Sequence, residues 1–347
     1  MSRIEELKRL AKISKDSKIV VAGAGSIGCY VGGRLIQAGR QVTFLGRERI
    51  QKELGTYGLK LTHFDGHEHT IPATELDIST TPAVLRDADI ILVTVKSGAT
   101  LSIGEDIHAL APQDAVIVSL QNGVTNADKL ASVVGDRQVV AGMVPFNVAQ
   151  LGDGRFHQGT SGEIVIASGI DGLQETLSAP PIEVEESSDM PAVMWGKLLL
   201  NLNNALNALS GLPLKQQIED RAWRRLLADQ LAETLDVLAA AEIKPHSALP
   251  IPPSFQPHLM RLPTPVFKIL AARMLKIDPL ARSSMWEDLQ QGRMTEIDEL
   301  QGAVISLAES VGKDAPICSR VSQLVKEAEG AKAGSPELSV EMVRAGA

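Results

Sequence analysis

The sequence predicts an α/β fold in which an N-terminal Rossmann-type domain, built on a parallel sheet, is followed by an all-helical C-terminal domain. In the first half, short apolar and β-branched runs alternate with helical stretches, as expected of strands buried on both faces. Past about Pro180 the pattern becomes helical, with almost no strand signal. We therefore expect an N-terminal extension at 1–16, the Rossmann domain at 17–186 and the helical domain at 187–347.

The composition narrows the classes of protein to consider. The 347 residues, 44% hydrophobic and 22% charged, suffice for two globular domains of common size. A net charge of -8 gives no general attraction to nucleic acid or anionic lipid, so we expect neither as a partner. Cys29 and Cys318 lie far apart without a neighbouring histidine cluster, which predicts neither disulfide bonds nor a bound metal. The N-terminus lacks the apolar core of a secretory signal, so a cytoplasmic protein is expected.

Five apolar runs predict the strands of the sheet. They are Lys18 to Ala22, Gln41 to Leu45, Ile90 to Val95, Ala115 to Leu120 and Gln138 to Met143. Between the first two, Ile27 to Ala38 predicts a helix that ends at Gly39, because glycine suits the left-handed position after a helix. The stretch from Leu59 to Ile71 is polar and contains three histidines, and we expect a hairpin or a loop there.

The second half carries helical periodicity in five segments. They are Met190 to Leu209, Gln217 to Ala241, Val266 to Leu275, Ser283 to Gln290 and Glu296 to Val311. Proline, serine and acidic residues at 178–191 place the domain boundary in that stretch. The proline-rich segment 249–265 is expected to be a long loop, either functional or a simple connection across the surface.

A glycine-rich motif stands between the first strand and the first helix. In GAGSIG at 23–28, Gly23 permits a tight turn, Gly25 lets backbone approach a pyrophosphate and Gly28 allows close helix packing. In this strand–helix context the motif predicts dinucleotide binding rather than a turn that merely tolerates glycine. The residues expected to contact the cofactor are Gly23, Ala24, Gly25, Ser26, Ile27 and Gly28.

The second strand ends in Gly46-Arg47 rather than in the acid that would bind the free ribose hydroxyl of NAD. The guanidinium of Arg47 offers a fork of donors to a 2′-phosphate, which favours NADP(H) as the cofactor. Glu48 follows directly and keeps NAD(H) open as the alternative. The other interpretation is that RERIQK at 47–52 is only the solvated start of a helix.

Polar side chains also follow the third and fourth strands. Lys96 comes after Ile90 to Val95, and Asn122 comes after Ala115 to Leu120. Ligands of open α/β sheets bind at the carboxyl ends of the strands, so both are candidates for contacts with phosphate and carbonyl oxygens. Asn122-Gly123 is also a common turn pair, and that interpretation stays open.

In the helical half, WGKLLLN at 195–201 places Lys197 and Asn201 on one face of a Leu-rich helix. Burial would lower the pKa of such a lysine toward the range useful to a general acid. A lysine that extends over an apolar surface to solvent explains the pattern equally well. Further on, Thr295 to Asp298 matches a capping box at a helix start, and its composition alone does not indicate a site.

These motifs, taken together, resemble the ketopantoate reductase (2-dehydropantoate 2-reductase) family. The resemblance extends from about Ser17 to Glu327 and is carried by GAGSIG at 23–28, VTVKS at 93–97, SLQNGV at 119–124, WGKLLLN at 195–201 and SSMWEDLQQGRMTEID at 283–298. It implies a Rossmann domain that binds NADPH, a helical domain, and a small 2-oxo acid substrate bound between them. Hydride transfer of this kind requires no metal.

The resemblance also implies roles for individual residues. Lys197 would be the general acid, and Glu296 would orient both the substrate hydroxyl and the lysine. Asn122 and Asn201 would contact polar groups of the substrate, and Ser284 its carboxylate. Arg47 and Lys96 would flank the adenosine 2′-phosphate, and Asn122 would also line the cofactor site.

One position departs from the family pattern. Ala205 stands where these reductases usually carry a second asparagine, four residues after Asn201. Asn203, Asn204 and Asn207 lie nearby, but a shift of one or two positions turns a side chain about 100° or 200° around a helix. A substrate contact is therefore expected to be missing, and a site without it discriminates less among related acids.

The leading hypothesis is an NADPH-dependent reductase that makes (R)-pantoate from 2-dehydropantoate for pantothenate and coenzyme A synthesis. The first alternative is a reductase for a different small 2-oxo acid, which Ala205 supports. The second is a non-catalytic NADPH sensor, which would not need Lys197 and Glu296. A helical interaction module fused to a vestigial nucleotide fold is the third. The sequence leaves monomer and homodimer open.

Overall fold

The computed structural model describes residues 13–247, 251–272, 275 and 278–346. The chain divides into two compact units, Met1–Met190 and Pro191–Ala347. The expected order of an α/β unit followed by a helical unit is confirmed. Most of the predicted extension at 1–16 lies outside the described residues, but Ile13 is buried in the core of the first unit.

The large sheet of the first unit has eight strands in the order β12-β11-β8-β7-β6-β1-β2-β5. Their bounds are β1 Lys18–Ala22, β2 Gln41–Leu45, β5 Asp77–Ser79, β6 Ile90–Val93, β7 Val116–Ser119, β8 Val139–Met143, β11 Ile164–Ala167 and β12 Val184–Ser187. All neighbours pair in parallel except β11 with β8. All five predicted strands are present, and the order from β5 to β8 is that of a doubly wound dinucleotide-binding fold.

Helices cover both faces of this sheet, which explains the continuous apolar runs. The helices of the first unit are α2 Ser26–Gln37, α3 Glu48–Tyr57, α4 Thr100–Leu110, α5 Asn126–Ala131 and α6 Leu173–Leu177, with 3₁₀ turns at Ala73–Glu75, Pro82–Asp87 and Ser97–Ala99. In β6, Ile90 and Leu92 pack into the core formed with α2, whereas Ile91 and Val93 pack into the core formed with α4. Every side chain of β6 is therefore buried.

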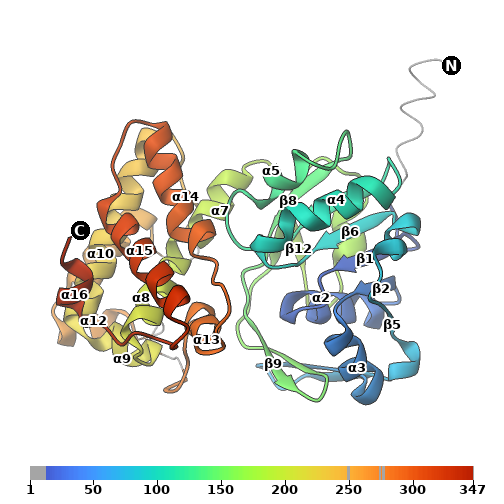
Figure 1. Cartoon of the computed structure of the whole chain (residues 1–347), viewed down its shortest axis with the longest axis horizontal. Coiled ribbons are helices and arrows are strands. Elements are labelled where there is room, and N and C mark those ends of the chain that lie inside the picture. The colour runs from blue at the N-terminus through green and yellow to red at the C-terminus, as the bar shows by residue number, and fades with distance from the viewer. Residues whose placement is uncertain (1–12, 248–250, 273–274, 276–277, 347) are drawn as a thin grey trace. The chain divides into compact units, whose positions relative to one another are not determined.

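A second sheet, of which the sequence indicated only a hairpin or loop at 59–71, covers α2 on the side away from the large sheet (Figure 1). It has four strands in the order β4-β3-β10-β9, with bounds β3 Leu59–His63, β4 Glu68–Ile71, β9 Val148–Gly152 and β10 Arg155–Gln158. A side chain at Gly32 would meet Phe44 of the large sheet, and one at Gly33 would meet Leu59 and Leu61 of the small sheet. Two adjacent glycines thus let both sheets approach one helix closely.

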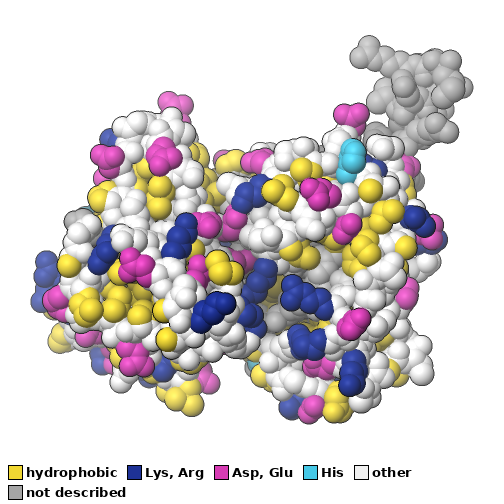
Figure 2. Space-filling view, viewed as in Figure 1, with side chains coloured by type: hydrophobic (Ala, Val, Ile, Leu, Met, Phe, Trp, Pro, Cys, Tyr) yellow, Lys and Arg dark blue, Asp and Glu magenta, His cyan; other side chains and the backbone are white. Residues whose placement is uncertain are grey.

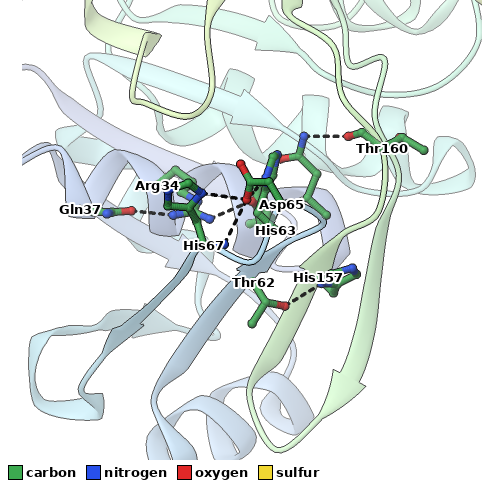
Figure 3. Close-up of polar contacts among 10 residues, drawn as sticks. Arg34, Gln37, Thr62, His63, Asp65, His67, His157 and Thr160 are labelled. Atoms are coloured by element: carbon green, nitrogen blue, oxygen red, sulfur yellow. Dashed lines mark hydrogen bonds and ion pairs between the residues drawn. The ribbon is translucent and has the colours of Figure 1, made fainter.

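The polar stretch at Leu59 to Ile71 is the hairpin β3–β4. At its turn, Oδ1 of Asp65 lies 2.6 Å from Nδ1 of His63 and 2.9 Å from Nδ1 of His67 (Figure 3). The backbone N–H of His67 and the two imidazoles stabilise the carboxylate and hold the pKa of Asp65 well below its usual range. No group of three or more potential metal ligands occurs among the described residues.

The described part of the second unit is helical throughout, as predicted. Its helices are α7 Met190–Asn201, α8 Asn203–Ser210, α9 Leu214–Glu219, α10 Arg221–Ala240, α11 Gln256–Arg261, α12 Thr264–Leu270, α13 Ser284–Gln290, α14 Ile297–Ser310, α15 Pro316–Ala331 and α16 Val340–Arg344, with a 3₁₀ turn at Pro253–Phe255. The segment expected as one helix from Met190 to Leu209 is divided at Leu202 into α7 and α8. The Nε2 of Gln301 donates to the carbonyl of Leu202 at 3.0 Å, where it competes with the helical hydrogen bond.

The prediction of a long loop at 249–265 was wrong for most of that segment. Residues 249 and 250 lie outside the described residues, but α11 and the start of α12 fall within it. Pro257 and Pro265 occupy the first turns of these helices, where a missing backbone N–H costs nothing. The fully buried guanidinium of Arg224 connects this segment to the end of α9. It donates to the carbonyls of Met260 and Leu262 and the hydroxyl of Thr264 in the segment, and to the carbonyls of Ile218 and Glu219.

The face of the molecule in Figure 2 mixes acidic and basic side chains. Val266, Ile269 and Leu270 of α12 are exposed, Ile269 by 76%. Among the described helices, none is long and apolar enough to span a bilayer.

Candidate active site

In the first unit, the predicted cofactor residues lie along one edge of the large sheet. The strands β2, β1, β6 and β7 are neighbours in that order and run parallel, so their carboxyl ends meet at the same edge. Arg47 follows β2, the glycine loop follows β1, Lys96 follows β6 and Asn122 follows β7. The structure thus brings these predicted side chains to one side of the fold, where open α/β sheets bind ligands.

The glycine loop closes tightly between β1 and α2. Gly23 has φ +117°, a backbone conformation that side chains disfavour, and a Cβ on it would lie 2.5 Å from the backbone nitrogen of Val95. A Cβ on Gly28 would lie 2.6 Å from Oγ1 of Thr94, which itself donates to the carbonyl of Gly23 at 2.6 Å. The first and third glycines are therefore required by the packing of the loop against the end of β6.

The space in front of the loop fits a dinucleotide pyrophosphate. A Cβ on Gly25 would meet nothing within 4 Å, and Gly25 is exposed. Gly25 caps α2 without a side-chain hydrogen bond, so the backbone N–H groups of the first turn point toward this open space. A helix start with unpaired donors and positive potential suits a phosphate. The residues that would hold it are Gly23, Ala24, Gly25, Ser26, Ile27 and Gly28.

Arg47 and Lys96 flank the glycine loop in the sheet order. Arg47 is the N-cap of α3, and its exposed side chain makes no hydrogen bond or ion pair to the residues that the structure describes. Lys96 is the N-cap of the 3₁₀ turn Ser97–Ala99 and is also exposed. Glu48 occupies the first turn of α3 and is exposed as well. Two cations therefore stand at the ends of β2 and β6.

In the second unit, the predicted catalytic pair consists of Lys197 on α7 and Glu296 at the start of α14. Burial lowers the pKa of Lys197 to about 8, because the ammonium loses hydration. The negative charge of Glu296 acts in the opposite direction and raises the pKa of Lys197. The two effects oppose each other, and the effect of burial is the larger.

A close backbone crossing fixes the helix that carries Lys197. The N–H of His246 donates to the carbonyl of Ala192 at 2.8 Å, and a Cβ on Gly196 would collide with the carbonyl oxygen of His246. Gly196 precedes Lys197 directly, so only glycine lets this crossing occur next to the lysine. The sequence did not predict this role of Gly196, because no local pattern around Gly196 indicates that the backbone of His246 packs against it.

Three contacts hold the segment around Glu296. The backbone N–H of Thr295 donates to Oε1 of Glu329 on α15 at 2.7 Å. Within the turn between α13 and α14, the guanidinium of Arg293 lies 2.8 Å from Oδ1 of the buried Asp288. The contact from Gln301 to the carbonyl of Leu202 joins α14 to the end of α7. The contacts of Glu329 and Gln301 were missed from the sequence, since they are long-range and leave no local pattern.

The expected capping box at Thr295 to Asp298 is not the observed geometry. The helix α14 begins at Ile297 with Glu296 as its N-cap, and Glu296 makes no side-chain cap hydrogen bond. The hydroxyl oxygen of Thr295 accepts from the N–H of Ile297 at 3.2 Å, which is the nearest substitute for a cap.

Asn201 and Ser284 belong to the same unit as Lys197. Asn201 is the last residue of α7 and is partly exposed, and Ser284 is the exposed first residue of α13. The start of α13 is tied to α8, because the N–H of Ser283 donates to Oδ1 of Asn207 at 2.9 Å and its hydroxyl donates to the carbonyl of Asn204 at 3.0 Å. The position of Ser284 is thereby fixed relative to the helix that follows Asn201.

Ala205, which stands where the family pattern predicts an asparagine, lies in α8 among three asparagines. Ala205 is completely buried in α8. Asn203 exchanges hydrogen bonds with Gln217, and the amide of Asn207 donates to Gln217 and to the carbonyl of Leu212. Two of the three nearby asparagines therefore serve the packing of α8 against α9 and its loop.

Family models match most of the chain. The model described as ketopantoate reductase PanE/ApbA matches residues 19–169, and the model for the ketopantoate reductase PanE/ApbA C terminal matches residues 189–329. A 2-dehydropantoate 2-reductase of Halobacterium salinarum is 27% identical over 327 residues, which cover 90% of this chain and 99% of that protein.

Solved structures of similar fold cover the chain to the same extent. The PanE/ApbA family ketopantoate reductase from Ralstonia eutropha JMP134 superposes with a TM-score of 0.78 at 28% identity and covers 91% of this chain and 99% of its own. The ternary structure of D-mandelate dehydrogenase with NADH and anilino(oxo)acetate superposes with a TM-score of 0.75 at 22% identity, again covering 91% and 99%.

Proposed function

The chain belongs to the ketopantoate reductase family, and from this premise we propose that it reduces 2-dehydropantoate (ketopantoate) to (R)-pantoate with NADPH. It is an oxidoreductase of that family. The proposed reaction is a step of pantothenate and coenzyme A biosynthesis, and the proposed location is the cytoplasm.

The pairing of Lys197 with Glu296 is the observation that carries the proposal. Reduction of a 2-oxo acid at C2 produces an alkoxide that must take up one proton, and a positioned acid accelerates such a step about 10²- to 10⁴-fold. An ammonium with a pKa of about 8 is protonated near neutral pH and gives up its proton readily. In the proposed mechanism, Nζ of Lys197 donates a proton to the developing hydroxyl oxygen. The carboxylate of Glu296 favours the charged lysine and orients it.

The remaining polar residues would bind the substrate. The carboxamides of Asn122 and Asn201 offer donors and acceptors to the oxo or hydroxyl groups, and the exposed hydroxyl of Ser284 offers a donor to the carboxylate. None of the three is ionised, so they would orient the substrate without changing the charge around Lys197.

The cofactor assignment rests on the edge of the large sheet. The glycine loop and the start of α2 would hold the pyrophosphate, and Arg47 and Lys96 would bind the adenosine 2′-phosphate. When bound, NADPH would supply the hydride that C2 of the substrate receives. Glu48 beside Arg47 is the feature that keeps NADH as the competing cofactor.

A different 2-oxo acid is the second candidate substrate. Ala205 is buried, and its neighbours Asn203 and Asn207 are engaged within the second unit, so the contact expected from a second asparagine has no replacement in them. The fold is also that of a D-mandelate dehydrogenase. A site with one polar contact fewer would accept acids with other side chains.

The test is the rate of NADPH absorbance loss with the purified protein, measured with 2-dehydropantoate, with a panel of other 2-oxo acids including benzoylformate, and again with NADH. Turnover confined to 2-dehydropantoate and NADPH supports the proposal. Turnover only with another acid keeps the mechanism and replaces the substrate. NADPH binding without turnover on any acid favours the non-catalytic sensor, and failure to bind NADPH favours a vestigial nucleotide fold.

A further inference from the structure

We propose that Asn126 is a positioning residue for this reaction, because its buried amide ties the turn that carries Asn122 to the segment that carries Lys96. Asn126 is the first residue of α5 and is 1% exposed. The inference rests on the proposed function, in which Asn122 contacts the substrate and the cofactor and Lys96 contacts the 2′-phosphate.

The side chain of Asn126 makes three hydrogen bonds, which lead to both segments. Its Nδ2 donates to the carbonyl of Asn122 at 2.6 Å and to Oγ of Ser97 at 3.0 Å. Its Oδ1 accepts from Oγ1 of Thr100 at 2.9 Å. Ser97 follows Lys96 directly. The amide of Asn126 therefore contacts the backbone of Asn122 and the residue next to Lys96.

Gln121 forms a second connection between the same two segments. Its Nε2 donates to Oγ1 of Thr100 at 2.7 Å and to the carbonyl of Val95 at 3.0 Å. Its Oε1 accepts from Oγ of Ser119 at 3.1 Å. The hydroxyl of Thr100 therefore accepts from Gln121 and donates to Asn126, and it links the two amides into one network.

The network begins where the sheet ends. The register of β6 with β7 stops at Val93 and Ser119, and the backbone bond from Leu120 N–H to the carbonyl of Val93 at 2.9 Å extends it by one step. Beyond this point, the side-chain amides of Gln121 and Asn126 connect the segment after β6 with the segment after β7. Buried, mutually satisfied polar groups of this kind define one geometry rather than several.

This arrangement has a kinetic consequence. Hydride transfer and proton donation require the reacting atoms in a near-attack geometry, and a displacement of about 1 Å lowers a rate about 100-fold. If Asn126 holds the Asn122 turn and the Lys96 segment together, its loss changes cofactor affinity and turnover at once. A residue that only stabilises the fold would lower the melting temperature and leave the kinetic constants of the folded enzyme unchanged.

The experiment compares four variants in the full chain. Asn126→Asp keeps the size of the side chain but removes the donors to Asn122 and Ser97, and Thr100→Val removes the bridging hydroxyl at nearly constant volume. Thr100→Ser restores that hydroxyl. Arg137→Met is the control for stability. The guanidinium of this buried arginine donates to backbone carbonyls near the amino ends of β7 and β8, away from the proposed site. Those carbonyls are of His108, Ala111, Pro112 and Val134.

For each folded variant, kcat and KM for 2-dehydropantoate and the Kd for NADPH are measured together with the melting temperature. We expect Asn126→Asp and Thr100→Val to lower kcat about 10- to 100-fold and to weaken NADPH binding, with Thr100→Ser close to the wild type. Arg137→Met should lower only the melting temperature. Unchanged kinetic constants in both Asn126→Asp and Thr100→Val, or equal kinetic losses in Arg137→Met, overturn the inference.

The same measurements separate the inference from the proposed function. A wild-type protein that binds NADPH but reduces no 2-oxo acid refutes the proposed function, and the Kd for NADPH alone then decides whether Asn126 positions the Lys96 segment. A wild-type protein that does not bind NADPH refutes both.

Discussion

At the scale of single residues, Lys197 is subject to two opposing effects. Desolvation favours the neutral amine and lowers its pKa to about 8, whereas the carboxylate of Glu296 favours the ammonium. A general acid must be protonated before it can act, so activity in the reduction direction depends on the protonated fraction. That fraction falls about tenfold for each pH unit above the pKa.

The first prediction follows from this pKa. We expect kcat/KM for reduction to be constant below about pH 8 and to fall above it as Lys197 loses its proton. Glu296→Gln removes the negative charge that raises the pKa, so the decline should move to lower pH. Lys197→Ala should lose most turnover and retain its NADPH affinity. A profile that is identical in the wild type and Glu296→Gln, or full turnover in Lys197→Ala, would remove the pair from the mechanism.

The second prediction concerns the contribution of Arg47 to the selectivity for NADPH over NADH. Arg47→Ala would remove the proposed charge-assisted hydrogen bonds to the 2′-phosphate. We therefore expect the Kd for NADPH to rise about 10- to 100-fold while the Kd for NADH changes little. Arg49→Ala is the matched control, since Arg49 is exposed on the same helix but pairs with Glu53 at 3.1 Å. Titration of protein fluorescence with each nucleotide measures both constants. Equal weakening of NADPH and NADH would refute the phosphate contact.

At the scale of elements, Gly196 lets another segment cross α7 next to Lys197. Gly196→Ala would place a methyl group against the carbonyl of His246 and force the two segments apart. We expect a loss of about 1–3 kcal/mol in the free energy of unfolding, as for other overpacked contacts. Turnover should fall as well, because the displaced helix turn carries Lys197, the proposed general acid.

The control for this third prediction is Gly302→Ala on α14, where the nearest atoms to a new Cβ lie 3.5 Å away on Asp298. That change should be neutral or stabilise the protein by about 0.5–1 kcal/mol, because alanine favours a helix. Urea denaturation followed by circular dichroism gives both values. Similar stabilities for the two variants would show that the crossing at His246 tolerates a side chain.

The elements that could be predicted from the sequence are those whose burial produces a local run of apolar residues. The strands β1, β2, β6, β7 and β8 are covered on both faces and therefore read as continuous apolar runs. The second sheet has no such signal, since strands such as Glu68–Ile71 are largely polar and are held by packing on α2. The helices α11 and α12 were missed because prolines in their first turns resemble a loop.

The same distinction applies to the candidate site. Arg47, Lys96 and Asn122 could be placed from the sequence, because each follows a recognisable strand. The interaction of Glu296 with Lys197 could not, since the two residues lie far apart in the sequence, and only the family resemblance indicated it. Glu329, Gln301 and Asn126 were missed altogether, because a buried polar side chain has no sequence pattern that reveals its partner.

At the scale of the whole molecule, the glycine loop belongs to one compact unit and the proposed general acid to the other. The fourth prediction concerns the linkage between cofactor and stability. A ligand that binds only the folded chain at 100 times its Kd adds about 2.7 kcal/mol to the free energy of unfolding. We therefore expect the melting temperature to rise with the logarithm of the NADPH concentration, and to rise less with NADH.

Differential scanning fluorimetry across a range of nucleotide concentrations measures this effect, with Arg47→Ala as the variant in which the advantage of NADPH over NADH should disappear. Equal shifts with the two nucleotides in the wild type would contradict the assignment of NADPH. Sedimentation velocity on the same preparation distinguishes the monomer from the homodimer, both of which the sequence leaves open.

The enclosure of α2 between two sheets has a consequence for how the cofactor site behaves before anything binds. Gly32 and Gly33 bring a sheet against each side of this helix, so α2 cannot tilt or slide without separating layers of the core. Its first turn is the proposed pyrophosphate cradle, which is therefore preorganised in the free protein, and little ordering entropy opposes binding. Beyond its first turn, the amide hydrogens of α2 should exchange with solvent only when the whole unit opens, whether or not a nucleotide is present.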